Sequence, residues 1–359
     1  MKIGKTKLIA ENIAPSNASS LAIFKGHTKI CDVDIAKMQP QNLGTKLYSF
    51  GLLSDVHVNL WTGDNNATTF ANALTYFENQ GCNFVCISGD LTNTGFYMYE
   101  DDATVDTVNW YDEAQFAEYK RICDLHPNMP VYGCCGNHES YVKPITENLV
   151  ELEEFTGYGL TFTITKGNDL FIFVGQSEEN IPMSYEHFVW LGNTLEGNKD
   201  KRCFVFIHPY VDASDSGNPK GLHRTPLFDY TTVDKHGYDK STFASLMANY
   251  PNAILFHGHS HMQFENQELV RNANYSTALG FKSIHVPSTA YCREIVETET
   301  EVDGEIIKTY SMENRETTAQ GYIVDVYKNH IVLKGYDFTE SAEVPIAQYC
   351  IDSIGTITT

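Results

Sequence analysis

Two histidines separated by one residue, His259 and His261, follow a short apolar run and could bind a metal ion together. That run, residues 253–256, has the composition of a buried strand, and Gly258 lies just before the first histidine. Glycine would let the chain turn there, so that both imidazoles face one small volume. A pair of this kind taken alone is equally well explained as polar loop histidines, so its interpretation depends on what accompanies it.

Four segments upstream place further nitrogen and oxygen donors just beyond short apolar runs. They are Asp55-Val56-His57, Gly89-Asp90, Gly136-Asn137-His138-Glu139 and His208-Pro209. In an open α/β sheet, ligands bind outside the carboxyl ends of the strands, so donors at five strand ends indicate one shared crevice. The mixture of imidazole and carboxylate favours manganese, iron, zinc, cobalt or nickel over Mg²⁺ or Ca²⁺.

The number of donors indicates two metal ions rather than one. The candidates exceed the four ligands of a tetrahedral ion, and Asp90, with two carboxylate oxygens, is the expected bridge. The candidate ligands are Asp55, His57, Asp90, Asn137, His208, His259 and His261. The cofactors expected are therefore two divalent or trivalent transition-metal ions, with manganese, iron and zinc the leading choices.

This set of charges predicts a reaction at phosphate. Two divalent cations, Asp55, Asp90 and a bridging hydroxide leave a net charge of about +1, which would attract a phosphate oxyanion. Ions about 3.5 to 4 Å apart can hold the attacking and leaving oxygens of an in-line displacement and bring the pKa of bound water to about 7. We expect a metal-dependent phosphoester hydrolase in which the bridging hydroxide attacks phosphorus in line.

These residues resemble the calcineurin-like metallophosphoesterases. The resemblance spans residues 47 to 338 and presents the motifs in that family's order: Asp55-x-His57, Gly89-Asp90, Gly136-Asn137-His138-Glu139, His208 and Gly258-His259-x-His261. It implies an α/β fold, a four-layer αββα sandwich of two mixed β-sheets flanked by helices, with the site at the strand ends.

The resemblance also implies a role for each residue. Asp55, His57 and His261 would hold one metal, and Asp90 would lie between it and the second metal. The ligands implied for that second metal are Asn137, His208 and His259. His138 is similar to the family's substrate-facing histidine, which binds phosphate and protonates the leaving group.

Within the family, the pattern differs from that of the purple acid phosphatases. Asp55-Val56-His57 departs from their motif, and the segment after Asp90 lacks the chromophoric tyrosine that those enzymes carry. Residues 89–95 are more similar to the class III cyclic nucleotide phosphodiesterases. The expected substrate is a small phosphoester, cleaved by a phosphodiesterase or a phosphatase.

Composition limits the partners of the chain. Its 359 residues carry 25 Lys and Arg against 46 Asp and Glu, a net charge of -21, which disfavours duplex nucleic acid as a partner. Neither a signal-like apolar segment nor a membrane-spanning run occurs, so we expect no membrane contact. Nine cysteines, an odd number, without a C-x-x-C pair predict reduced thiols and a cytoplasmic location.

Apolar spacing divides the chain into three parts. Residues 1–45 contain a predicted hairpin (21–24 with 28–35) and a linker, and form an appendage that could bind an assembly partner. Residues 46–340 alternate strands and helices and form the metallophosphoesterase domain, with helices predicted near 69–80, 112–125, 184–195 and 241–249. Further hairpins are predicted at 160–174, around 303–304 and at 322–336. Residues 341–359 are expected to be a C-terminal tail.

Three further histidine and arginine positions lie close to the motifs. His257 precedes the last motif and is expected to support it rather than to bind metal. Residues 209–238 form a long segment beside a candidate ligand, and His223 or Arg224 within it could contact substrate, although a solvated loop explains both equally well.

Two other functions fit parts of the sequence. One is a nuclease, which the net charge disfavours. The other is an attachment or structural module in which residues 1–45 bind a larger assembly and the metal site is secondary.

Overall fold

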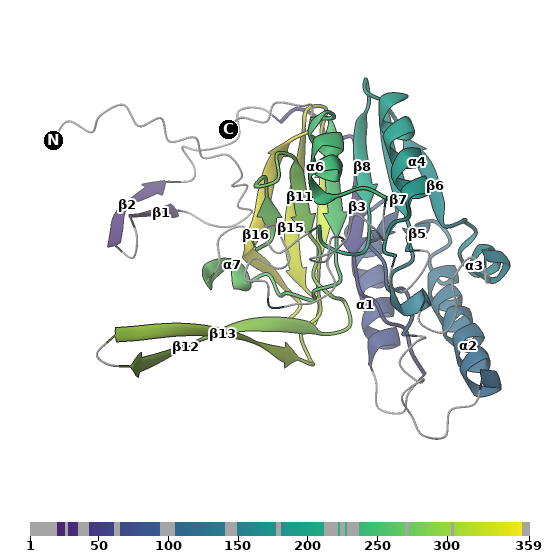
Figure 1. Cartoon of the computed structure of the whole chain (residues 1–359), viewed down its shortest axis with the longest axis horizontal. Coiled ribbons are helices and arrows are strands. Elements are labelled where there is room, and N and C mark those ends of the chain that lie inside the picture. Colours follow the sequence, from purple (N-terminus) through teal and green to yellow (C-terminus); the bar gives the residue numbers. More distant parts are fainter. Residues whose placement is uncertain are drawn as a thin grey trace.

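Two β-sheets pack face to face, and helices cover their outer sides (Figure 1). The structure is a computed structural model. Besides the two strands of an N-terminal hairpin, it describes residues 43–60, 65–93, 105–140, 149–176, 181–211, 222, 227, 237–269, 273–302 and 305–353. The fold has four layers, helix, sheet, sheet and helix, as the resemblance implied.

Both sheets are mixed. In the first sheet, β3, β4 and β5 run parallel to one another, and the other strands pair antiparallel. The order of its strands is β16 (Ala342–Asp352), β15 (His330–Asp337), β14 (Gln320–Val326), β3 (Tyr48–Leu53), β4 (Val85–Ile87) and β5 (Val131–Gly133). In the second, β7, β8, β9 and β11 are parallel; its order is β10 (Tyr275–Ser276), β11 (Lys282–His285), β9 (Ala253–His257), β8 (Arg202–Phe206), β7 (Asp169–Val174) and β6 (Thr161–Lys166).

Aromatic side chains fill the space between the sheets. Phe50 of β3 lies edge-on to Phe171 of β7 and to Phe204 of β8, with ring centroids 5.3 and 5.6 Å apart. The central parallel strands are buried on both faces, which explains their continuous apolar runs in the sequence. This interior fixes the strand ends where the candidate ligands follow.

The helices bury their apolar faces on the outer sides of the sheets. Helices α1 (Asn66–Asn79) and α2 (Val105–Asp124) cover the first sheet; α4 (Tyr185–Glu196) and α6 (Lys240–Ala248) cover the second. Two shorter helices are α3 (Leu149–Thr156) and α7 (Asn266–Leu269). Ser184 caps α4, because its hydroxyl accepts a hydrogen bond from the His187 amide. Among the described helices, none combines the length and apolarity needed to cross a bilayer.

Two segments at the ends of the chain bear on the predicted domain boundaries. The N-terminal hairpin is present as β1 (Ser20–Lys25) and β2 (Thr28–Asp34), but its side chains lie outside the described residues. Residues 342–352, expected to belong to a tail, instead form β16, which pairs with β15. Its alternation of apolar and polar residues is interrupted by Pro345, and the register with β15 shifts nearby, so periodicity alone concealed the strand.

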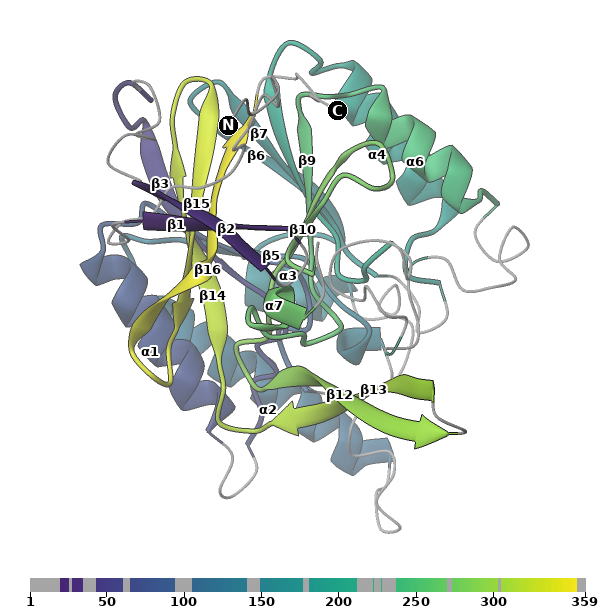
Figure 2. The same ribbon diagram turned by 90° about the vertical axis from the view of Figure 1, so that its left-hand side faces the viewer.

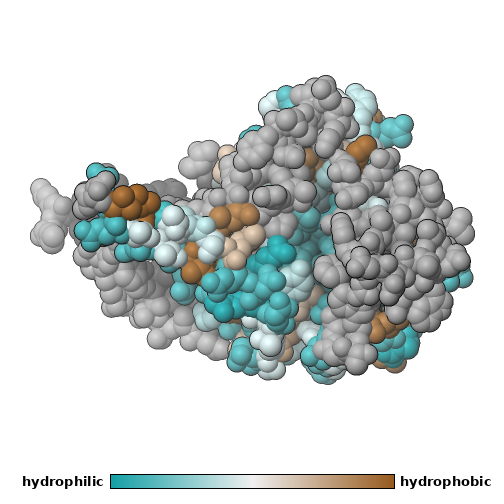
Figure 3. Space-filling model, turned by 60° about the horizontal axis from the view of Figure 1, so that its bottom comes forward, coloured by the Kyte–Doolittle hydropathy of each residue, from teal (hydrophilic) through white to brown (hydrophobic). Residues whose placement is uncertain are grey.

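A long two-stranded ribbon projects from the molecule (Figures 1 and 2). It is formed by β12 (Cys292–Val302) and β13 (Glu305–Arg315), which pair along their whole length, as predicted for a hairpin around 303–304. Apolar side chains stand out among hydrophilic ones near its free end (Figure 3), and those exposed there are Val302, Ile306 and Ile307. The ribbon begins beside the candidate site.

A buried ion pair of the second sheet anchors hydrogen bonds to the first sheet, at the edge opposite the candidate site. Arg202 and Asp169 begin β8 and β7, and the guanidinium donates to both carboxylate oxygens at 3.1 and 2.5 Å. Arg202 also donates to Ser353 at 2.7 Å, and Tyr48 of β3 donates to Asp169. The network therefore ties the second sheet to the first and to the end of β16.

We expect the Asp169→Asn substitution to lower the free energy of unfolding by about 3 to 5 kcal/mol, because it leaves the Arg202 cation buried without its counter-ion. Urea unfolding followed by circular dichroism measures this change. The matched control is Glu118→Gln, which removes an exposed pair with Arg121 and should cost less than about 1 kcal/mol. Equal losses in the two variants would show that the buried pair does not hold the sheets together.

Candidate metal centre

The candidate ligands all follow strands, and the sheets bring them to one edge. Asp55 follows β3, Asp90 follows β4 and Asn137 follows β5, three parallel neighbours in the first sheet. His208 follows β8, while His259 and His261 follow β9, its parallel neighbour in the second sheet. Side chains from both sheets therefore meet where the two carboxyl edges face each other.

Unusual backbone conformations position most of these side chains. Five of the six non-glycine residues with positive φ in the described chain are candidate ligands. They are Asp55 (49°), His57 (47°), Asp90 (49°), His259 (73°) and His261 (59°). A non-glycine residue in this region costs about 1 to 3 kcal/mol and persists only when its surroundings impose it, which is typical of functional sites. The fold thus sustains strain in order to aim these donors.

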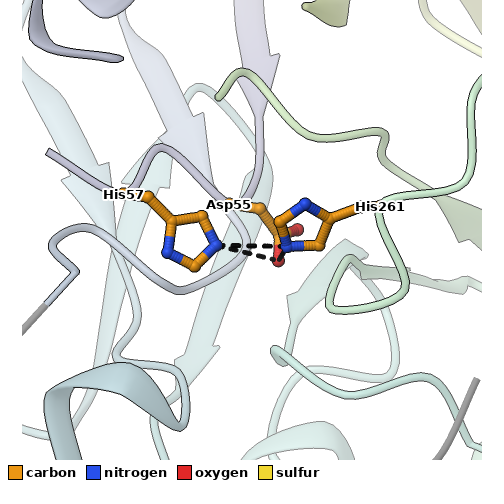
Figure 4. A group of neighbouring side chains, drawn as sticks. All are labelled: Asp55, His57 and His261. Atoms are coloured by element: carbon orange, nitrogen blue, oxygen red, sulfur yellow. Dashed lines mark hydrogen bonds and ion pairs between the residues drawn. The ribbon is translucent and has the colours of Figure 1, made fainter. Parts of the chain in front are cut away.

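Asp55, His57 and His261 form a first cluster (Figure 4). The Nε2 atoms of the two histidines are 3.1 Å apart, and Asp55 Oδ1 lies 3.1 Å from His261 Nε2 and 3.9 Å from His57 Nε2. Three potential ligand atoms therefore converge on one point, and all three side chains are buried. A cation at this point would satisfy all three lone pairs at once.

Asp90, His208 and His259 form a second cluster. His208 Nε2 lies 3.1 Å from Asp90 Oδ2 and 3.1 Å from His259 Nδ1. Asn137, also buried, lies in the loop that closes over Asp90: the His138 amide donates to Asp90 Oδ1 at 3.0 Å. The amide side chain is thus carried by the loop that contacts the second cluster.

Asp90 lies between the clusters. Its Oδ2 atom is 3.1 Å from Nε2 of His208 in the second cluster and 3.6 Å from Nε2 of His57 in the first. His138 Nε2 is 3.9 Å from the same oxygen, and His57, Asp90 and His138 make up a third group of potential ligands. This is the arrangement that a bridging carboxylate requires.

Main-chain carbonyl groups orient two of the histidines. His208 Nδ1 lies 2.9 Å from the Ser88 carbonyl oxygen, and His261 Nδ1 lies 2.9 Å from that of Tyr291. Each contact places the ring proton on Nδ1 and leaves the Nε2 lone pair facing the site. Sequence reasoning missed both partners, because a carbonyl group belongs to every residue and gives no signal.

Glu139 ties the loop of the third motif to the neighbouring strand end. Its carboxylate accepts from the Gly136 amide at 2.7 Å and from the Thr92 amide at 2.8 Å. Burial, together with the charge of Asp90, raises the pKa of Glu139 to about 7. The sequence motif includes this residue, but only the structure shows that it fixes the position of the loop over Asp90.

The electrostatics of the site call for positive charge. Burial acts to raise the pKa of Asp55 and of Asp90, but the surrounding histidines outweigh it and hold both well below the usual range. Burial lowers the pKa of His57 and of His138, whereas at His208 the two aspartates overcome burial and raise the pKa to about 9. The two carboxylates are therefore held in the ionised form, which is the form that binds metal, and His208 would release a proton on binding one. The residues therefore fit a pair of cations.

Gly258 has a different role from the one predicted. Its φ is not positive, and the turn is made by His259 and His261 instead. A Cβ atom at Gly258 would lie 1.7 Å from Ser54 Oγ and 2.3 Å from Asp55 Oδ2. The glycine is required because the ends of β3 and β9 approach each other closely, which brings Asp55 to the two histidines.

Of the remaining candidates, one is placed beside the clusters and two lie outside the described residues. His257 is buried with its ring 5.6 Å from that of His285, and it belongs to none of the three ligand groups found in the described chain. His223 and Arg224 fall on residues that the structure does not describe. The eight cysteines that it does describe are free thiols, and both Cys134 and Cys135 are buried outside these groups.

Comparison with protein families identifies the fold and its chemistry. The family model described as calcineurin-like phosphoesterase matches residues 48–263, the segment that contains every candidate ligand. The chain belongs to the calcineurin-like phosphoesterase family. Together with the three ligand groups, this membership makes it a metal-dependent phosphoester hydrolase with a dinuclear metal site. A search of curated proteins found no match.

Solved structures share the fold of this family member at low sequence identity. A dimetal phosphatase from Danio rerio aligns with a TM-score of 0.55 and 13% identity, over 86% of this chain and 100% of that chain. A purple acid phosphatase from yellow lupin (Lupinus luteus) seeds aligns with a TM-score of 0.52 and 12% identity, over 87% of this chain and 55% of the other. Both therefore support the arrangement of sheets and helices.

Proposed function

We propose that the protein hydrolyses a small phosphoester with two transition-metal ions held at the junction of its sheets. Asp55, His57 and His261 would hold one ion, Asn137, His208 and His259 would hold the other, and Asp90 would lie between them. The observation that carries this proposal is the position of Asp90 Oδ2, within 3.6 Å of histidine nitrogens from both clusters. Manganese, iron and zinc suit this mixture of imidazole and carboxylate.

The bound ions would supply Lewis acidity at phosphate and lower the pKa of a bound water. The side chains provide the remaining functions. In the reaction as a whole, a water oxygen forms the new bond to phosphorus, the ester P–O bond breaks, and the leaving oxygen must gain a proton. His138 is suited to donate that proton, because the charge of Asp90, whose Oδ2 atom lies 3.9 Å from Nε2 of His138, favours the protonated ring and opposes the lowering of its pKa by burial. Its side chain is also 16% exposed, against 5% or less for His57, His208 and His261.

The substrate could be a phosphodiester or a phosphomonoester, and we propose a phosphodiester. Residues 89–95 resemble the class III cyclic nucleotide phosphodiesterases, which favours a phosphodiester, but the structure describes only residues 89–93 of this segment. Removing His138 should slow the hydrolysis of diesters and of monoesters alike when the leaving group is poor, so it does not distinguish the two ester types. A comparison of the two ester types with one protein preparation is therefore the informative assay.

The test uses purified full-length protein supplied with Mn²⁺, Fe²⁺ or Zn²⁺ in separate reactions. We expect hydrolysis of p-nitrophenyl phosphate or bis-p-nitrophenyl phosphate that a chelator abolishes and added metal restores. Faster turnover of the diester would support the narrower resemblance. Failure to hydrolyse either ester with any of these metals, in protein shown to be folded and to contain metal, would refute the proposal.

A further inference from the structure

The projecting ribbon is attached directly to a candidate ligand. The Arg293 amide donates to the His261 carbonyl oxygen at 2.6 Å, and the Arg293 carbonyl oxygen accepts from the Gln263 amide at 3.0 Å. Asn266 donates from Nδ2 to the same carbonyl oxygen at 2.9 Å. Below these bonds Ile295 packs on Met262, the residue after His261. The first residues of β12 are therefore held in a fixed position relative to the metal centre.

The side chains of Tyr291 and Arg293 lie one after the other, with Tyr291 nearer to the first ligand cluster. The Tyr291 ring lies 4.4 Å from the His261 ring and 6.2 Å from the His57 ring, centroid to centroid, and is nearly parallel to the latter at 25°. The guanidinium carbon of Arg293 lies 5.8 Å from the centroid of the Tyr291 ring. A tyrosine ring therefore separates the first ligand cluster from an arginine cation.

Arg293 differs from the other cations of the ribbon. Arg315 pairs with Glu294, and Lys308 pairs with Glu297 and Glu299. Among the residues that the structure describes, Arg293 has no carboxylate partner, although the chain carries a net charge of -21. It is half-buried, and its guanidinium is hydrogen-bonded to the Tyr291 side chain rather than to a carboxylate. A ligand anion could therefore bind this cation without displacing a carboxylate of the described chain.

The contact of the Arg293 cation with the Tyr291 ring also differs from the other cation–ring contacts in its position. The described cation–ring contacts involve the rings of Phe84, Tyr132, Phe204 and Tyr291. Of these rings, only that of Tyr291 touches histidines of the ligand clusters. The guanidinium is thus one ring away from ligand histidines, and its fork of donors matches phosphate or carboxylate.

We propose that Tyr291 and Arg293 form a subsite for the leaving-group part of the substrate, in which Arg293 binds a second anionic group. This inference rests on the proposed phosphoester hydrolysis and names the class of ester: one whose alcohol part carries a phosphate or a carboxylate. The linking atoms pass beside Tyr291, and Arg293 selects for charge at their far end. Esters with a neutral alcohol part bind only at the metal centre.

Three substrates on one four-carbon chain test this subsite: the monophosphate of 1,4-butanediol, its bisphosphate, and 4-phosphooxybutanoate. Release of inorganic phosphate gives kcat/KM for each with the metal-loaded full-length protein. We expect kcat/KM about tenfold higher for the two substrates with an anionic end, beyond the twofold statistical advantage of the bisphosphate. The bisphosphate and the carboxylate show which anion the subsite prefers.

Variants assign the preference to Arg293. Arg293→Gln should abolish it while changing kcat/KM for the monophosphate less than threefold, and Arg293→Lys should retain part of it. Arg315→Gln, in the neighbouring strand of the same ribbon, is the matched control and should retain all of it. A preference that is absent from the wild-type protein, or that persists in Arg293→Gln, would overturn the proposal.

A binding measurement separates this inference from the proposed function. Calorimetry compares butane-1,4-bisphosphonate with butylphosphonate, neither of which can be hydrolysed. Arg293→Gln should weaken binding of the bisphosphonate about tenfold and leave that of butylphosphonate unchanged. Wild-type protein that hydrolyses none of the esters would refute the proposed function alone, whereas equal bisphosphonate affinity in wild type and Arg293→Gln would refute the subsite alone.

Discussion

Replacing Asp90 with asparagine is expected to reduce kcat/KM for every phosphoester substrate by about a thousandfold or more. The asparagine side chain would occupy nearly the same volume but would remove the negative charge between the clusters and replace one carboxylate oxygen with an NH₂ group. Charge stabilisation by bound ions contributes several kcal/mol to such reactions, which corresponds to several orders of magnitude in rate. Steady-state kinetics with p-nitrophenyl phosphate at saturating metal measure the loss.

The matched control for this prediction is Asp325→Asn. Asp325 is also a buried aspartate, but it pairs with Lys46 and Lys334 at the opposite edge of the first sheet. Its replacement should change kcat/KM less than about threefold at a temperature where the variant is folded. Activity of the Asp90→Asn variant within tenfold of wild type would contradict a bridging role.

Replacing His138 with alanine is expected to lower kcat by about 10² to 10⁴, the usual contribution of a general acid. The loss should be larger for alkyl esters than for p-nitrophenyl esters, because p-nitrophenolate leaves readily without a proton. Metal content should remain unchanged, because His138 is assigned to the substrate. Kinetics on the two ester types, together with metal analysis, test these statements.

A structural alternative exists for His138, because it belongs to one of the three groups of potential ligands. If the variant lost one metal equivalent and all esters were affected equally, His138 would be a ligand rather than an acid. His187→Ala serves as the control, since His187 lies on α4, on the outer side of the second sheet. This control should retain full activity and full metal content.

The sequence predicted the elements that have a clear period or a continuous apolar run. Helix α1 was recognised because Phe70, Ala73, Leu74 and Phe77 lie on one face, and all four are buried. Parallel strands such as β8 were recognised from their continuous apolar runs, which occur because these strands are buried on both faces. Since parallel strands end at one edge, a polar donor after each strand was sufficient to predict that the donors meet.

Features that depend on distant parts of the chain were not predictable in this way. The pairing of β14 with β3 joins segments far apart in the sequence, and β16 depends on its register with β15. The carbonyl groups of Ser88 and Tyr291 orient ligand histidines without any signature in residue type. Tyr291 and Arg293 likewise acquire their proximity to the centre only because the start of β12 is hydrogen-bonded to His261.

The most direct test of a two-ion centre is the number of metal ions that one chain binds. Full-length protein, stripped with a chelator, reloaded with Mn²⁺ or Zn²⁺ and freed of excess metal, is analysed by mass spectrometry under native conditions and by elemental analysis. The convergence of both clusters on Asp90 predicts two ions per chain in the wild-type protein and at most one in Asp90→Asn. A wild-type protein that never binds more than one ion would contradict the account.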